Sequence, residues 1–282
     1  MFSLKVENEA GDILDFSESG RYVVYKIEGL NPPQATINKS VNMTRDGSKV
    51  GSVRVESRNL VLYTTIEGDV ESGRINLYKY FQIKKEVTLY YKNGIRDVFI
   101  KGIVEMIECD LFDEKQKAQI SIVCAKPYFK DVEYIVTNFS DISSLFEFPF
   151  SIPESGIEFS AIMTNVRKSI INVGDVETGT IIKIFAVGTV ENPIIYDVMK
   201  KEHMKLDFTM QASDMIVINT NVGEKGITLV RNGVSSNLLG KMEKDSSWFV
   251  LEPGDNVFAF TCDSGESNLQ ITFTTSAMYA GV

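Results

Sequence analysis

Cysteine, histidine and tryptophan are all scarce in this chain of 282 residues. It has three cysteines (Cys109, Cys124 and Cys262), no CxxC pair, and His203 as its single histidine. A zinc site of the usual cysteine–histidine kind therefore lacks ligands, and we expect buried free thiols. No serine-hydrolase, P-loop, zinc-protease or dinucleotide-binding motif occurs either. We therefore expect no catalytic residues, no metal site and no cofactor.

Long apolar runs are also missing. No stretch approaches the roughly 18 to 20 apolar residues that a membrane-spanning helix requires. The first residues, MFSLKVENEAGDILDF, include acidic side chains early and do not resemble a signal peptide. Since 44% of the residues are hydrophobic, a folded core is expected. These features predict a protein that is made and kept, or assembled, in the cytosol.

Charge is spread unevenly along the chain. Residues 1–130 carry 19 basic and 18 acidic side chains, whereas residues 131–282 carry 10 basic and 20 acidic ones. The second half therefore has a net charge of −10, which repels phosphate backbones and argues against nucleic-acid binding. The change in charge also suggests two modules. We place the boundary between residues 130 and 150, with domains at 1–135 and 136–282.

Alternation of apolar and polar residues dominates the sequence. In LQITF, Leu269, Ile271 and Phe273 fall on one face, which is typical of a half-buried strand. Turn signals such as Asn232-Gly233 separate runs of this kind at intervals of roughly ten residues. This pattern predicts β-sandwiches or barrels, so the fold class is mainly β.

One segment has helical spacing instead. Ile75, Tyr78 and Phe81 recur at three-residue intervals, and Asp69 or Ser72 could cap the start of a helix over about 72–84. Strands are expected after it, at 87–91, 98–108 and 118–125. The segment FEFPFSIPESGIEF, which begins at residue 146, resembles a strand-like linker lying against a neighbouring surface.

Residues 32–53 are unusually polar for a compact domain. They open with two prolines and contain few core-forming residues, and a loop of this length is usually functional or disordered. Weak alternation on both sides favours an extended, projecting hairpin with Asp46-Gly47 near its tip.

Trp248 lies beside a proline–glycine corner, and it could be a sugar-binding platform or a packing residue. Because Trp248 and Phe249 are adjacent, one of the two must face inward, and we favour a mostly buried Trp248. His203, in MKKEHMKLDF, is interpreted as an exposed turn residue. Carboxylate pairs are abundant, so glycosidase chemistry stays open on composition, but any acidic surface produces such pairs.

Several blocks in order closely resemble phage distal tail proteins of the siphophage tail-component type. The blocks run from about residue 28 to the final YAGV, and they are EGLNPPQATIN, GDVESGRINLYKYF, VTLYY, CAKPYF, FEFPF, NVGDVETGTIIKIFAVGTVENPIIYD and WFVLEPGDNVFAFTCDSG. Tail-like bacteriocins use the same type of component.

The resemblance implies a structural virion protein and no enzyme. It implies an N-terminal split-barrel-like domain related to tail-tube proteins, with one helix, and a C-terminal galectin-like β-sandwich. A hairpin arm within residues 32–58 would embrace the neighbouring subunit in a ring of six. The ring would join the tail-tube protein to the tail-associated hub protein in the virion tail, with a receptor-binding protein as a further partner.

The arm and the sandwich allow more specific expectations. Lys39, Arg45 and Lys49 are basic against Asp46 alone, so the arm is expected to meet an acidic strip on its neighbour. The alternative function is a carbohydrate- or receptor-binding module of the tail tip. The galectin pattern of sugar-binding residues is absent, because neither the surroundings of His203 nor those of Trp248 match it.

Overall fold

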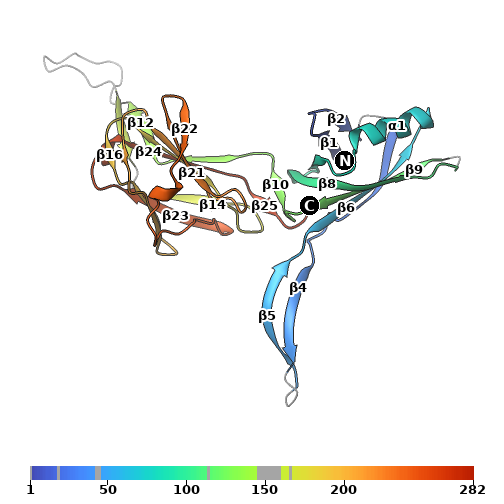
Figure 1. The fold of residues 1–282 in the computed structure, drawn as a ribbon, viewed down its shortest axis with the longest axis horizontal. Helices are drawn as coiled ribbons and strands as arrows, with labels where there is room; N and C mark the ends of the chain where they lie inside the picture. The colour runs from blue at the N-terminus through green and yellow to red at the C-terminus, as the bar shows by residue number, and fades with distance from the viewer. Residues whose placement is uncertain (1, 18–19, 42–45, 113–114, 145–159, 165–166) are drawn as a thin grey trace. The chain divides into compact units, whose positions relative to one another are not determined.

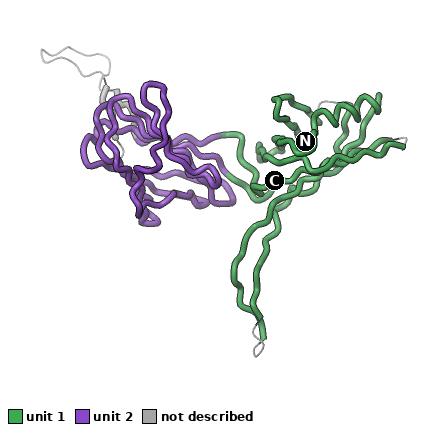
Figure 2. The backbone as a smooth tube through the Cα atoms, viewed as in Figure 1, with its two compact units in different colours: residues 1–133, 278–282 green, residues 134–277 purple. Residues whose placement is uncertain are grey.

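The chain is divided into two compact units. The computed structural model describes residues 2–17, 20–41, 46–112, 115–144, 160–164 and 167–282. Unit 1 contains residues 1–133 and 278–282, and unit 2 contains residues 134–277 (Figure 2). Unit 2 is thus inserted into unit 1, whose last strand follows it in the chain. Nothing in the sequence indicated that return.

Unit 1 is built on one large antiparallel sheet (Figure 1). In spatial order its main strands are β2 (Ile13–Asp15), β1 (Ser3–Asn8), β7 (Glu86–Lys92), β8 (Asp97–Cys109), β9 (Lys117–Cys124), β6 (Arg58–Ile66) and β3 (Tyr22–Glu28). The short strand β10 (Phe129–Asp131) pairs with β8 and with β25 (Met278–Tyr279). The edge strands β2 and β3 do not pair with each other among the described residues, so the sheet stays open and forms no closed barrel. The predicted mainly β fold is confirmed.

The one α-helix of the described chain, α1 (Val70–Tyr80), packs on this sheet. Its N-cap is Asp69, whose Oδ1 accepts a hydrogen bond from the Ser72 amide at 3.3 Å, so Ser72 lies inside the helix. Gly73 permits the close approach, because a Cβ there would lie 2.5 Å from the Ile66 side chain. Leu77, a residue of the same helix, is fully buried. The predicted range of 72–84 began two residues late and ended four residues late.

Unit 2 is a β-sandwich of two principal sheets. The first sheet contains, in spatial order, β11 (Ile135–Asn138), β24 (Leu269–Thr275), β15 (Ile181–Ala186), β20 (Met215–Asn219), β21 (Gly226–Arg231) and β22 (Val234–Asn237). The second sheet contains β14 (Arg167–Asn172), β23 (Gly254–Thr261), β17 (Ile194–Asp197) and β18 (Glu202–Lys205). Smaller pairs are β12 (Ser140–Ser144) with β13 (Ser160–Thr164), and β16 (Val190–Glu191) with β19 (Thr209–Met210). The predicted linker from residue 146 lies outside the described residues.

The core of the sandwich joins the two sheets through aromatic side chains. The rings of Phe258 on β23 and Phe273 on β24 lie 4.9 Å apart between centroids, and both are buried. The predicted inward face of Leu269, Ile271 and Phe273 is confirmed. Asn232 and Gly233 form the two-residue turn between β21 and β22 with positive φ angles of 50° and 77°, as the sequence predicts.

Phe249 is the one of the two adjacent aromatic residues that faces the core, and Trp248 packs beside it. The Phe249 side chain is fully buried and meets Phe258 edge to face at 5.3 Å between ring centroids. Trp248 is only partly buried against the same core, and the Lys225 ammonium lies 5.6 Å from its ring centroid. The two residues lie in an irregular segment before β23, where only one can enter the core.

The two aromatic residues should therefore contribute unequally to stability. We expect Phe249→Ala to lower the free energy of unfolding by about 3–5 kcal/mol, the usual cost of emptying a buried aromatic site. Trp248→Ala should cost only about 1–2 kcal/mol, because part of the ring already contacts water. Urea unfolding of both variants measures the difference. Equal losses would show that the tryptophan is as important to the core as Phe249.

Candidate functional site

The main candidate for function is a hairpin that stands apart from the sheet of unit 1. Its strands, β4 (Ala35–Val41) and β5 (Ser48–Val55), pair with each other and with no other described strand. Figure 1 shows the hairpin extending away from the sheet beyond the start of β6. Its described side chains are exposed, apart from a half-buried Thr36. The predicted projecting hairpin is therefore present.

A bulge in β5 sorts the hairpin side chains into two faces. Ile37 pairs with Val53, whereas Lys39, two residues later, pairs with Val50, three residues earlier. The extra residue in β5 falls at Gly51 and Ser52, opposite Asn38. Cross-strand partners share a face, so the bulge moves Val50 to the same side as Val53.

One face of the hairpin is apolar as a result. It carries Ala35, Ile37, Val41, Val50, Val53 and Val55, with Lys39 and Ser48 as its two polar members. The five larger side chains are between 38% and 77% exposed. The opposite face is polar, with Thr36, Asn38, Ser40, Lys49, Ser52 and Arg54. An isolated two-stranded hairpin is marginal in water, and a row of exposed valines on it indicates a surface that another protein covers.

The predicted charged residues of the arm do not form one strip. Lys39 lies on the apolar face opposite Val50, whereas Lys49 lies on the polar face opposite Ser40. Asp46 is exposed in the bend before β5, and Arg45 lies outside the described residues. Sequence reasoning selected these residues for their charge and missed the apolar row, which becomes visible only once the bulge sets the register.

The base of the hairpin is fixed by a buried arginine. Arg58, at the start of β6, is only 4% exposed, and its guanidinium donates hydrogen bonds to four backbone carbonyls. The acceptors are Gly29 and Asn31 before the hairpin, Pro127 after β9 (2.7 Å), and Ala280 near the C-terminus. The guanidinium also lies 4.5 Å from the centroid of the Phe129 ring.

This arrangement ties three distant segments of unit 1 to one side chain. Burial lowers the pKa of the Arg58 guanidinium, and the four carbonyl dipoles compensate for its lost hydration. Arg96 adds a hydrogen bond to the carbonyl of Gly281, and the amide of Val282 donates to the carbonyl of Leu30 at 3.1 Å. The two ends of the hairpin therefore leave the sheet from a rigid base.

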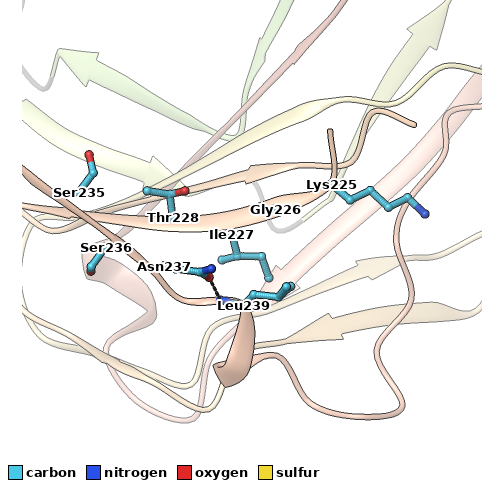
Figure 3. A pocket seen from close by; sticks show the side chains of 8 residues that line it. All are labelled: Lys225, Gly226, Ile227, Thr228, Ser235, Ser236, Asn237 and Leu239. Carbon is cyan, nitrogen blue, oxygen red and sulfur yellow. Dashed lines mark hydrogen bonds between the residues drawn. The ribbon is translucent and has the colours of Figure 1, made fainter. Parts of the chain in front are cut away.

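A surface hollow of unit 2 is lined mainly by polar residues, without a recognisable catalytic group among its described residues. The hollow in Figure 3, about 290 Å³ in volume, lies along β21 and β22. It is lined by Lys225, Gly226, Ile227, Thr228, Ser235, Ser236, Asn237 and Leu239. These residues include no nucleophile paired with a base. No described helix is long and apolar enough to cross a membrane.

Comparison with known proteins finds a likeness to phage tail components. Residues 173–276 match the family model of the siphovirus-type tail component, C-terminal domain. The matched residues lie within unit 2. The resemblance seen in the sequence is thereby confirmed. No curated protein matches the chain.

Solved structures extend the likeness over almost the whole chain. The Dit protein (gp 19.1) of phage SPP1, described as a paradigm of the hub adsorption apparatus in phages that infect Gram-positive bacteria, matches with a TM-score of 0.71 at 12% identity. Structures of the phage P2 baseplate in its activated conformation, with Ca and with Sr, match with TM-scores of 0.55 and 0.52 at 13% identity. Each match covers 98% of this chain and 99% of the other. Because the identities are only 12–13%, the likeness establishes the fold of both units and nothing further.

Proposed function

We propose that this protein is a structural subunit of a siphophage-type tail, the distal tail or baseplate hub. In this role it forms a ring, most simply of six copies, that joins the tail tube to the host-adhesion apparatus. The observation that carries the proposal is the freestanding hairpin with its uncovered apolar face. The family match of residues 173–276 and the shared fold with SPP1 Dit support the same role.

The hairpin is the contact between neighbouring copies in this proposal. Burying its five large apolar side chains, each already partly shielded, would contribute about 1 kcal/mol per side chain. A total near 5 kcal/mol can order the hairpin against a partner, but it does not offset the entropy of joining two free proteins. The ring therefore depends on further contacts of unit 1 or on the tail partners.

The remaining parts of the proposal follow from the same role. The protein acts without chemistry of its own, so it is a structural protein and not an enzyme. Its partners are further copies of itself, a tail-tube protein, a tail-associated hub protein and a receptor-binding protein. Its place is the virion tail, assembled in the host cytoplasm. A tail-like bacteriocin offers the same place to a protein of this design.

Two adjacent residues of β4 provide a direct test of the apolar face. Ile37 lies on the apolar face and Asn38 on the polar face. Ile37→Asp places a charge where we propose a buried contact, so self-association should weaken by about tenfold or more. Asn38→Asp adds the same charge to the other face and should have little effect. Sedimentation velocity over a concentration series measures both variants, and equal weakening would argue against a one-faced contact.

A further inference from the structure

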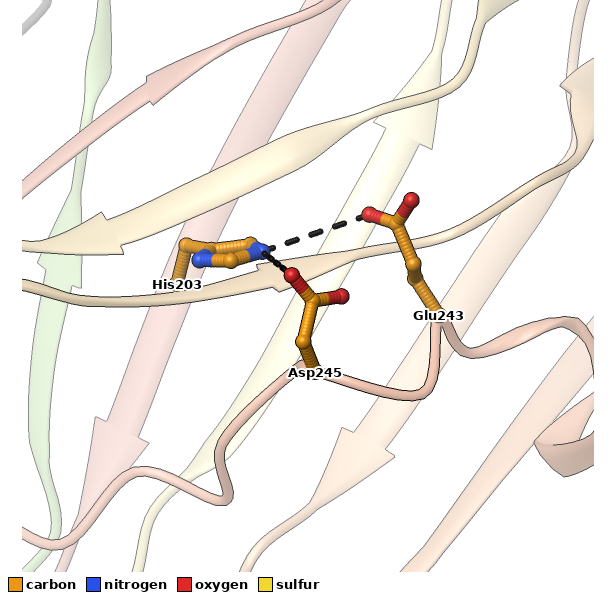
Figure 4. A group of neighbouring side chains, drawn as sticks. All are labelled: His203, Glu243 and Asp245. Atoms are coloured by element: carbon orange, nitrogen blue, oxygen red, sulfur yellow. Dashed lines mark ion pairs between the residues drawn. The ribbon is translucent and has the colours of Figure 1, made fainter.

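The only histidine of the chain lies against two carboxylates on the surface of unit 2. His203 is on β18, and Glu243 and Asp245 belong to the turn that follows residue 242. The His203 Nε2 atom lies 3.7 Å from Asp245 Oδ2 and 4.0 Å from Glu243 Oε2. Figure 4 shows one edge of the imidazole facing both carboxylates. All three potential ligand atoms lie within 4.8 Å of one another.

The backbone holds these three residues in fixed positions. The amide of Glu243 donates to the carbonyl of Lys205 at 3.0 Å, and the amide of Ser247 donates to the carbonyl of His203 at 2.8 Å. The Ser246 hydroxyl accepts a hydrogen bond from the Lys205 amide at 3.0 Å. The turn is thus fastened to β18 on both sides of Asp245. The imidazole in turn lies beside the Tyr196 ring, with 6.3 Å between centroids.

We propose that His203, Glu243 and Asp245 form a binding site for a divalent transition-metal ion of the zinc class. One imidazole and two carboxylates are a ligand set that such ions accept, whereas Ca²⁺ prefers six to eight oxygen ligands. Bonds of about 2.0–2.2 Å place tetrahedral ligand atoms about 3.4 Å apart. The three ligand atoms lie within 4.8 Å of one another, so side-chain rotation has to shorten a separation by at most about 1.4 Å. All three side chains are partly exposed, which leaves water to complete the coordination.

The lysine that shares a strand face with His203 is paired elsewhere. Lys205 shares the face of β18 with His203, but its ammonium lies 3.8 Å from Asp263. The prediction that the chain has too few metal ligands took only cysteine and histidine into account. Two carboxylates supply the missing ligands here, and their closeness to His203 could not be seen in the sequence.

Zinc titration of the full-length protein tests the proposal. The chain has one imidazole, so the ¹⁵N resonances of His203 report on this site alone. We expect Zn²⁺ to shift the Nε2 resonance with saturable, one-to-one binding. An equal amount of Ca²⁺ should leave the resonance in place. Zinc that bound only at cysteine thiols would leave the Nε2 resonance of His203 in place. An unshifted resonance after the addition of Zn²⁺ would therefore overturn the proposal.

Variants of the site provide a second measurement by isothermal titration calorimetry. Asp245→Asn and His203→Gln should each weaken zinc binding by about tenfold or more. Asp207→Asn, a matched exposed control outside the triad, should leave binding unchanged. Because the triad lies at the surface, with two exposed carboxylates and a half-buried His203, each variant should melt close to the wild-type profile, which confirms folding. Zinc affinity that survives the Asp245 and His203 changes would exclude this site, and an equal response to Ca²⁺ would overturn the assignment to a transition metal.

Discussion

Deletion of residues 36–54, with a Gly-Ser dipeptide joining Ala35 to Val55, is expected to abolish self-association and leave the subunit folded. The join is short because Ala35 and Val55 are cross-strand partners at the base of the hairpin. No side chain of the hairpin belongs to the buried core of the described chain. The melting temperature should therefore change by only a few degrees, while the apolar contact proposed between copies is lost entirely.

Native mass spectrometry of wild type and deletion at matched concentrations measures the result. The series should extend to high concentration, because the hairpin alone contributes too little to hold a ring at low concentration. Thermal melting of the deletion variant is the control for folding. A folded deletion variant that forms the same ring as wild type would disprove the role of the hairpin.

Replacement of Arg58 by methionine is expected to destabilise unit 1 by about 3–5 kcal/mol. The variant fills similar volume but leaves four backbone carbonyls without their donor, in a site that water does not reach freely. Arg58→Lys should recover little of the loss, since one ammonium cannot reproduce the planar set of donors. Urea unfolding gives the free energies.

Arg54 provides the matched control for Arg58. It is an exposed arginine on the hairpin that pairs with Glu56 at 3.2 Å, so Arg54→Met should cost less than about 0.5 kcal/mol. Hydrogen exchange adds a local measurement. The amide of Val282, bonded to Leu30, should exchange faster in Arg58→Met than in wild type. A loss below about 1 kcal/mol for Arg58→Met would show that water satisfies the four carbonyls.

The sequence predicted strands and turns well where a single local pattern determines them. Strand alternation located β7, β8 and β9 to within a residue or so, and Asn232-Gly233 formed the turn that its backbone angles require. The end of the helix was harder, because apolar spacing continues past Tyr80. Phe81 faces the core from the C-cap position, and Lys84 adopts a φ of 70° that no helix contains.

The candidate interface depended on pairing, which the sequence does not display. Val50, Val53 and Val55 are spaced by three residues and then two, so strict alternation would divide them between two faces. Only the bulge at Gly51 and Ser52 brings them together. For this reason the sequence of residues 32–53 indicates a polar segment, although the folded hairpin has an apolar face.

Contacts between distant segments were equally hidden. Arg58 resembles any other arginine in the sequence, and its four carbonyl partners come from positions 29, 31, 127 and 280. The approach of the turn at residues 243–245 to His203 likewise depends on the fold of unit 2.

The insertion of unit 2 into unit 1 has a consequence for the timing of synthesis. A ribosome that adds about 5–20 residues per second needs roughly 7–29 s to make residues 134–277. Until residues 278–282 follow, unit 1 lacks β25 and the Ala280 carbonyl that Arg58 binds. Nascent chains on one messenger RNA thus expose apolar hairpins close to each other before any of them has a finished unit 1. Any self-association that requires a complete unit 1 would therefore begin only after translation of the chain has ended.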